Sequence, residues 1–232
     1  MILENLNGVN VAVFESSSEL LDWTENNNAI MVAVNAEKIL HAESELRDII
    51  NSNLGYIDGA GPMLALKRKG IRNIVKIAGC ELWLRIAHRY HNRKSFYLVG
   101  ASAEIITETI LKLRQEFPGI NIVGFHDGYL TSESLKQAVI DDVVTLKPDI
   151  VFVAMGSPKQ EYFMEELQKR HHALYVALGG SFDVYTGKVK RAPRWWIDHN
   201  LEFAYRLFKQ PKRIRRQIHL LRFAWWILTD KM

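Results

Sequence analysis

Short apolar runs alternate with amphipathic stretches along most of the chain. An uninterrupted apolar run predicts a buried strand, and apolar residues spaced three and four apart predict a helix. The first residues predict a short hairpin. Further strands are predicted at 29–34, 74–77, 95–99, 120–125, 149–154 and 173–178, and helices at about 36–51, 81–91, 103–116, 132–146 and 159–169.

This alternation predicts βαβ units and therefore an α/β fold, a Rossmann-like parallel sheet with helices on both faces. Ligands of such sheets bind beyond the carboxyl ends of the strands. Polar or glycine-containing segments follow five of the predicted strands, at Asn35, Gly100, 125–129, 155–160 and 179–183. We therefore expect the functional site at this edge of the sheet.

The C-terminal region follows a different pattern. Pro193 interrupts the alternation, and Pro211 opens a final helix after one predicted over about 198–208. One face of the final helix is apolar, since it carries Ile214, Ile218, Leu221, Trp225 and Leu228. The sequence thus predicts a Rossmann-like body, residues 1–193, and a basic amphipathic helical appendage, residues 194–232.

Charge is distributed unevenly between these parts. Residues 188–232 carry 12 Lys or Arg and three acids, a formal charge of +9. Residues 1–187 carry 18 Lys or Arg and 23 Asp or Glu, a formal charge of −5. A basic helix with an apolar stripe and paired tryptophans is typical of attachment to an anionic membrane surface. Packing of the stripe on the body, with solvated arginines, is the alternative. Nucleic acid is the other anionic partner to weigh.

Several classes of protein are disfavoured by what the sequence lacks. Cys80 is the only cysteine, which excludes an internal disulfide and argues against a cysteine-ligated zinc site. The histidines show neither HxxxH nor HExxH spacing and there is no DxD triplet, so no metal is expected. The motifs GxGxxG and GxxxxGK[ST] are missing, so an ordinary NAD-binding protein or ATPase lacks its fingerprint here. With no secretory signal and no apolar run of about 18 residues, a cytoplasmic protein is expected.

Two segments carry candidate chemistry in or near helix starts. In YIDGAGP (56–62), Asp-Gly is a turn signal, and Asp58 could equally act as a general base that deprotonates a sugar hydroxyl. In AMGSPKQE (154–161), Ser157 and Gln160 fit a capping box. The same segment, with its turn at Gly156, could bind a diphosphate at the helix N-terminus.

Two further segments leave a structural and a functional reading open. The glycines that begin GGSFDVYTG (179–187) could form only a tight turn, but Asp183 could accept a hydrogen bond from a ribose hydroxyl. Asn35 in VNAEK (34–38) could cap a helix or contact a sugar.

Taken together, these segments resemble the WecG/TagA/CpsF glycosyltransferase family (glycosyltransferase family 26). The resemblance runs from about residue 30 to the end, and its most specific part is GSPKQE followed by GG-F-D-x-x-x-G-x-x-x-RAP. Residues 205–223 are closest to the branch that transfers N-acetyl-D-mannosaminuronic acid in enterobacterial common antigen synthesis. The matching segments are VNAEKIL, YIDGAGP, FYLVGAS, NIVGFHDGY, AMGSPKQE and GGSFDVYTGKVKRAP.

The resemblance implies a role for individual residues. Asp58 matches the catalytic base, Asn35 a sugar-contacting Asn and Gln160 an active-site Gln, while Asp183 lies in the motif expected near the nucleotide. Lys76 stands where the family has Arg, and this exchange keeps the charge but loses the bidentate guanidinium. Glu81 likewise replaces the commoner Asp. The other substrate-binding candidates are Gly100, Tyr129 and Gly156, with Arg206, Arg213 and Arg216 expected to meet diphosphate charge.

The implied activity is inverting, metal-independent transfer from a UDP donor, without a cofactor, by a hexosyltransferase. The acceptor implied is undecaprenyl-diphosphate-linked N-acetylglucosamine, and the location is the cytoplasmic face of the inner membrane, with peripheral attachment. N-acetylmannosamine and glucose are the alternative donor sugars, and a homo-oligomer is possible. A non-catalytic nucleotide- or nucleic-acid-binding protein is the alternative of another class, but it leaves the DGAG and GSPKQE segments without purpose, so no nucleic-acid partner is expected.

Overall fold

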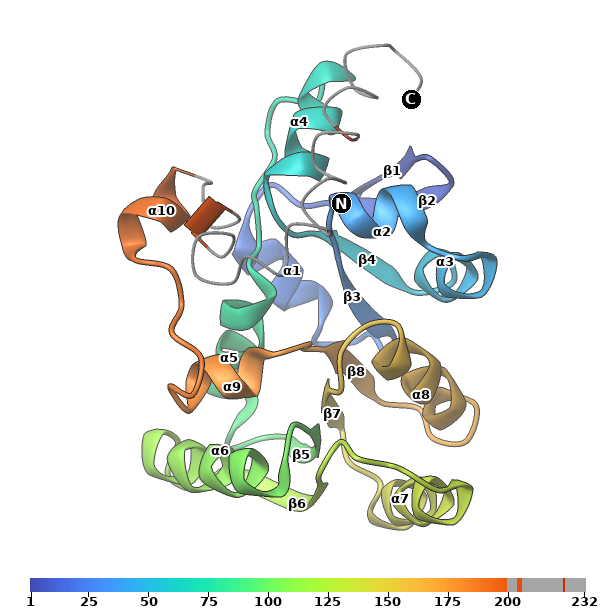
Figure 1. Ribbon diagram of the computed structural model, residues 1–232, viewed down its shortest axis with the longest axis vertical. Helices are drawn as coiled ribbons and strands as arrows, with labels where there is room; N and C mark the ends of the chain where they lie inside the picture. The colour runs from blue at the N-terminus through green and yellow to red at the C-terminus, as the bar shows by residue number, and fades with distance from the viewer. Residues whose placement is uncertain (200–203, 206–222, 224–232) are drawn as a thin grey trace.

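In the computed structural model, residues 1–199, 204–205 and 223 are described (Figure 1). Their strands form one eight-stranded sheet in the order β1-β2-β4-β3-β8-β7-β5-β6. β1 and β2 make the predicted hairpin, and the remaining neighbours pair in parallel, which confirms the α/β prediction. The strands are β1 (Ile2–Leu6), β2 (Val9–Val13), β3 (Ile30–Val34), β4 (Leu54–Ile57), β5 (Ser95–Gly100), β6 (Asn121–His126), β7 (Ile150–Ala154) and β8 (Leu174–Ala177).

Helices cover both faces of this sheet, as Figure 1 shows for α5 and α6 on one side and α7 and α8 on the other. Two separate apolar cores lie between the sheet and these layers. The helices are α1 (Ser17–Trp23), α2 (Ala36–His41), α3 (Ser44–Asn51), α4 (Ala60–Arg68), α5 (Gly79–Tyr90), α6 (Ala103–Glu116), α7 (Glu133–Leu146), α8 (Lys159–Gln168), α9 (Ser181–Tyr185) and α10 (Arg194–Asp198).

The central strands are apolar throughout because helices cover them on both faces of the sheet. Every residue of β7 is buried: Val151 and Val153 face the core with α7 and α8, whereas Ile150 and Phe152 face the core with α5 and α6. Parallel strands covered by helices on both faces show this uninterrupted pattern rather than an alternation of apolar and polar residues. The apolar runs in the sequence therefore predicted these strands correctly.

The chain reverses its winding direction between β5 and β7. The crossover from β5 leads outward to β6, whereas the crossover from β7 leads inward to β8. Adjacent carboxyl ends whose connections leave in opposite directions form the crevice in which α/β proteins bind ligands. Gly100 ends β5 here with φ +132°, and the Ala101 N–H donates to the Ala154 carbonyl at 2.9 Å.

Two predicted elements differ in the structure, and one strand, β4, is not among those that the sequence patterns predict. The strand predicted at 74–77 is wrong, because β4 already has β2 and β3 as neighbours, and a single bond from the Ile77 N–H to the Ile57 carbonyl holds the segment nearby. The helix predicted over 36–51 divides into α2 and α3 at Ala42, whose backbone is extended. The helix predicted over about 198–208 lies mostly outside the described residues; Ala204 and Tyr205, which are described, are helical, and a separate short helix, α10 (Arg194–Asp198), precedes them.

Apart from residues 204–205 and 223, the rest of the predicted appendage lies outside the described residues. The helix predicted from Pro211 and its apolar stripe fall there. The boundary between body and appendage at residue 193 therefore stays a prediction.

Gly100→Ala should lower the free energy of unfolding by at least about 2 kcal/mol, because an added Cβ collides with the Ala154 carbonyl at a backbone angle that side chains disfavour. Gly119→Ala is the matched control, since φ there is +87° but the space around it is open, and it should cost about 1 kcal/mol. Urea unfolding of both variants measures the difference. Equal losses would show that close packing at Gly100 contributes nothing.

Candidate active site

Asn35 and Asp58 lie side by side at the carboxyl ends of neighbouring strands. β3 and β4 are paired so that Val34 lies opposite Ile57, and the Asp58 N–H donates to the Val34 carbonyl at 2.9 Å. Each residue is the first after its strand and precedes a helix, α2 or α4. Two candidates 23 positions apart in the sequence are thereby brought to one point of the sheet edge.

The Asn35 side chain caps α2. Its Oδ1 accepts a hydrogen bond from the Lys38 N–H at 3.0 Å, and its backbone is extended as an N-cap requires. The structural reading of Asn35 is therefore confirmed. Its side-chain nitrogen is a further donor, and the predicted contact with a sugar stays a prediction.

The Asp58 carboxylate is half-buried and lies above a strongly apolar region. Gly59 follows with φ +90° and starts α4, so the chain turns sharply just beyond the carboxylate. The side chain of Tyr56, two residues earlier on β4, is fully buried. Burial raises the pKa of Tyr56 well above its usual value, and the neighbouring Asp58 carboxylate and Cys80 side chain raise it further. The Asp58 carboxylate thus interacts electrostatically with the side chain of Tyr56, whose phenol stays neutral.

A buried polar chain connects three of the strand-end loops. The Lys38 ammonium lies 3.3 Å from Glu161 Oε1, and the Gln160 Nε2 donates to the same oxygen at 3.2 Å. Gln160 Oε1 in turn accepts from the Gly179 N–H at 2.9 Å. Glu161 is fully buried and Gln160 is 3% exposed. The chain joins the residues after β3, β7 and β8.

This arrangement corrects the capping box predicted for Ser157 and Gln160. Within the described chain no side chain caps α8, whose N-cap is Pro158. Gln160 points instead to the β8–α9 loop, because its carboxamide bonds the Gly179 N–H. Gly156 forms the predicted turn with φ +79°, and its carbonyl accepts from the Gln160 N–H at 3.0 Å.

The candidates for the nucleotide end of the site lie at the winding reversal. The Gly128 N–H donates to the Ala101 carbonyl at 2.8 Å, so the loop after β6 lies against the turn at Gly100. Tyr129 is next in this loop and is 67% exposed. Asp183 is half-buried on α9, after the Gly179 turn. These positions surround the crevice, and no described contact joins Tyr129 to Asp183.

Lys76 lines a cavity near the end of β4, because the N–H of the next residue, Ile77, donates to the Ile57 carbonyl at 3.1 Å. This cavity has a volume of about 660 Å³ and is lined by Met63, Lys76, Glu81, Arg191, Ala192, Arg194 and Ile197. Three of these residues are cationic and one is anionic. Arg191 pairs with Glu81 at 2.7 Å, and the Lys76 ammonium donates to the Ile197 carbonyl at 3.5 Å. The cavity is therefore suited to an anionic ligand.

A larger cavity, of about 710 Å³, lies at the opposite edge of the sheet. It is lined by the last residues of α5 and α6, including His88, Arg93 and Phe117. These helices end where β5 and β6 begin, which places the cavity at the amino ends of the strands. We assign the site to the carboxyl edge because the polar strand ends and the winding reversal lie there.

One described residue of the tail contacts the body close to the site. Phe223 is buried, and a Cβ added to Gly61 would lie 3.2 Å from its ring and 2.9 Å from the Ala36 Cβ. Ala36 and Gly61 begin α2 and α4, just after Asn35 and near Asp58. Arg206, Arg213 and Arg216 lie outside the described residues, so their predicted phosphate contacts stay predictions.

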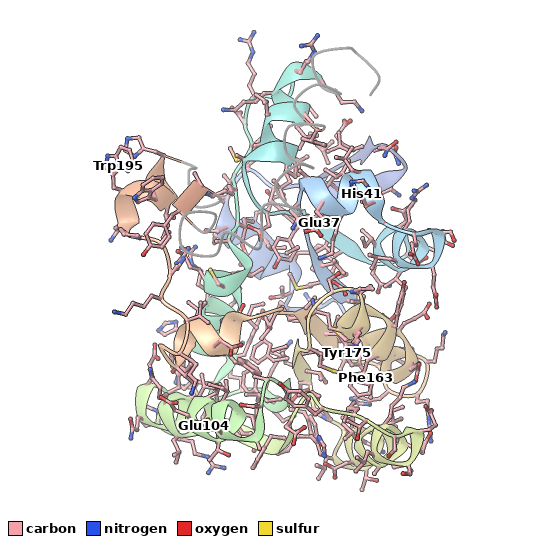
Figure 2. The ribbon with its side chains drawn as sticks, in the orientation of Figure 1. Glu37, His41, Glu104, Phe163, Tyr175 and Trp195 are labelled. Carbon is pink, nitrogen blue, oxygen red and sulfur yellow. The ribbon has the colours of Figure 1, made fainter. Side chains whose placement is uncertain are left out.

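Trp195 lies at the outer end of the described tail. It is 57% exposed on α10, and its ring stacks on His199 with centroids 4.4 Å apart (Figure 2). Trp196 lies beside it and contacts Tyr205. An exposed aromatic group next to a cation-lined cavity is a suitable surface for an amphipathic ligand.

For metal binding and membrane spans, the structure bears only on the residues that it describes. In that part, His, Cys, Asp and Glu side chains form no cluster of three or more suited to a metal. No described helix has both the length and the apolarity to cross a bilayer. Metal independence stays a prediction.

Comparison with known proteins agrees with this geometry. A sequence model described as the glycosyl transferase WecG/TagA/CpsF family matches residues 5–232. The chain belongs to this family. It is therefore a glycosyltransferase of cell-surface polysaccharide synthesis, and the expected family resemblance is confirmed.

Several residues at the candidate site of this glycosyltransferase have no role in the predictions made from sequence. Lys38 lies in VNAEKIL and Glu161 in AMGSPKQE. Nothing in the linear pattern indicates that these two residues, 123 positions apart, form a buried ion pair. Arg194 enters the sequence analysis only as tail charge, and Arg191 only as tail charge and as part of the RAP segment. The departure at Glu81 carried a signal, because Glu81 pairs with Arg191 of the RAP segment.

Asn35→Ala should destabilise the protein by about 1 kcal/mol, because the first turn of α2 loses its cap. Asn35→Asp keeps an acceptor oxygen and should retain the stability of the wild type. Urea unfolding compares the two variants, and sugar transfer is measured on both. Full transfer by the Asp variant would contradict a donor role of the Asn35 amide towards the sugar.

Proposed function

We propose that this enzyme transfers N-acetylmannosaminuronic acid from a UDP donor to N-acetylglucosamine linked to undecaprenyl diphosphate, with inversion and without a metal. The observation that carries the proposal is the position of Asp58, a half-buried carboxylate directly after β4 at the carboxyl edge of the sheet. A cation-lined cavity lies near the end of the same strand, because the segment that carries Lys76 is bonded to the Ile57 carbonyl. Membership of the glycosyltransferase family gives the reaction class. N-acetylmannosamine and glucose are the alternative donor sugars.

Asp58 acts as the general base. Its carboxylate takes the proton from the acceptor hydroxyl while that oxygen attacks the anomeric carbon of the donor. The bond from the anomeric carbon to the UDP oxygen breaks on the opposite face, so the configuration inverts and UDP leaves with the electron pair. The turn at Gly59 supports this role, because a glycine there keeps bulk away from the carboxylate.

Positive charge and backbone N–H groups stabilise the departing UDP. Groups fixed before the reaction stabilise developing charge without reorganisation, which makes them effective in a partly desolvated site. Asp183 binds the ribose and Tyr129 the base, at the crevice between β5 and β7. Gly100 and Gly156 let the diphosphate approach the backbone, and Gln160, which matches the family's active-site Gln, joins the segments after β7 and β8 that border the transferred sugar.

The cation-lined cavity supports an anionic substrate group beside Asp58. A uronic acid donor carries a carboxylate on the sugar in addition to its diphosphate, and the acceptor carries a diphosphate of its own. Lys76, Arg191 and Arg194 supply three positive charges against the one carboxylate of Glu81. Arg206, Arg213 and Arg216 of the tail add charge for the acceptor diphosphate.

The tail attaches the enzyme peripherally to the cytoplasmic face of the inner membrane. Its excess of basic residues is attracted to anionic lipid, at about 1 kcal/mol for each residue near the surface. Exposed Trp195 supports this location, because tryptophan favours the headgroup boundary. The contact of Phe223 with the body would bring the membrane-bound tail to the entrance of the site. Any apolar tail surface left outside the lipid could form a homo-oligomer.

Asp58→Asn should lower the transfer rate by at least about a hundredfold while leaving UDP affinity largely intact, because the amide cannot accept the proton. Transfer is measured with an N-acetylglucosaminyl-diphospho-lipid and a panel of UDP-sugars, in detergent with EDTA, followed by mass spectrometry. Asp48→Asn, an exposed change on α3, is the control. Normal turnover by Asp58→Asn would remove Asp58 from the base role, and a wild type inactive with every donor would contradict the proposed function.

Truncation before Pro211 should leave a folded body with weak transfer and no binding to anionic vesicles, because most of the basic tail is removed. Vesicle pelleting with phosphatidylglycerol, compared with phosphatidylcholine alone, measures the binding. Thermal unfolding shows whether the body remains folded. A truncated protein that binds and transfers like the full chain would contradict the role of the tail.

A further inference from the structure

Gln160 has two possible orientations of its carboxamide, and its neighbours determine which one is adopted. Its Nε2 donates to Glu161 Oε1 at 3.2 Å, and its Oε1 accepts from the Gly179 N–H at 2.9 Å. An ionised carboxylate only accepts hydrogen bonds and an ammonium only donates them. Lys38, 3.3 Å from Glu161, therefore favours the acceptor-only form of Glu161, and that form requires the Gln160 nitrogen to face it.

The orientation of Gln160 matters for the loop after β8. Gly179 has φ +56°, and its N–H meets the carboxamide oxygen as the chain leaves the sheet. If the carboxamide were reversed, an NH2 group would face the Gly179 N–H, and two donors would oppose each other. The Gly179 N–H is partly buried, and a donor there left without an acceptor is costly, so the loop would shift. Asp183 lies four residues further along this loop and helix.

We propose that Lys38 and Glu161 are positioning residues for the transfer reaction, because together they hold the Gln160 carboxamide in the orientation that fixes the β8–α9 loop. The inference rests on the proposed function for its kinetic consequence. The pair is well suited to this task, since the Glu161 side chain is fully buried and that of Lys38 is 12% exposed. Solvent therefore screens their interaction weakly.

The decisive variant is Glu161→Gln. A glutamine at this position can donate or accept, so both orientations of Gln160 become available. We expect kcat to fall about tenfold, as small misplacements of groups in an active site do, with UDP still bound. The Gly179 amide should exchange its hydrogen about tenfold faster, measured by NMR, because its acceptor is no longer fixed. Glu166→Gln on the same helix, which removes the charge of one half-buried partner of Lys136, is the matched control.

The double variant Lys38→Met with Glu161→Gln separates positioning from stability. Lys38→Met alone leaves a buried carboxylate without its cation and should lower the thermal unfolding midpoint most. The double variant carries neither charge, so its midpoint should rise towards that of the wild type while transfer stays slow and Gly179 exchange stays fast.

Recovery of transfer together with stability in the double variant would overturn the inference, and so would wild-type kinetics and exchange in Glu161→Gln. Wild-type transfer in the same assay tests the proposed function separately. Gly179 exchange needs no substrate, so it tests the orientation of Gln160 even if the assumed donor is wrong.

Discussion

The sheet of this glycosyltransferase is covered by helices on both faces, and most other features of the body depend on this constraint. Backbone polar groups of a buried strand must pair with neighbouring strands, so seven strands lie parallel and each crossover passes over a face as a helix. All parallel strands then end at one edge, where Asn35, Gly100 and Asp58 lie. The site is thus a consequence of how the apolar strands are buried.

At this edge of the sheet, polar side chains form hydrogen bonds and ion pairs with other groups of the protein itself. Asn35 caps α2, Glu81 pairs with Arg191, and Lys38, Glu161 and Gln160 form a buried chain that reaches Gly179. Such interactions restrict the loops to one arrangement, which is what preorganised electrostatic stabilisation requires. Structural and catalytic roles at this edge therefore overlap, and a cap residue such as Asn35 can serve both.

Sequence patterns predicted most of the parallel strands, missed β4 (Leu54–Ile57), and failed where the position of a segment depended on its neighbours. The strand predicted at 74–77 has suitable residues, but both sides of β4 are occupied. The capping box at Ser157 and Gln160 has suitable spacing, but a buried carboxylate and the Gly179 N–H bind the Gln160 side chain instead. In both cases a tertiary contact outweighed a local preference.

The sequence by itself determined the fold class, the family and the identity of the strand-end residues, because apolar periodicity and motif spacing are properties of the linear chain. It also indicated Asp58 and Asn35 as candidates. Only the tertiary structure decided that these two are adjacent, that Lys38 meets Glu161 and that Arg191 and Arg194 line a cavity with Lys76. Such contacts depend on strand order and register, which are set by the packing of the whole sheet rather than by any segment alone.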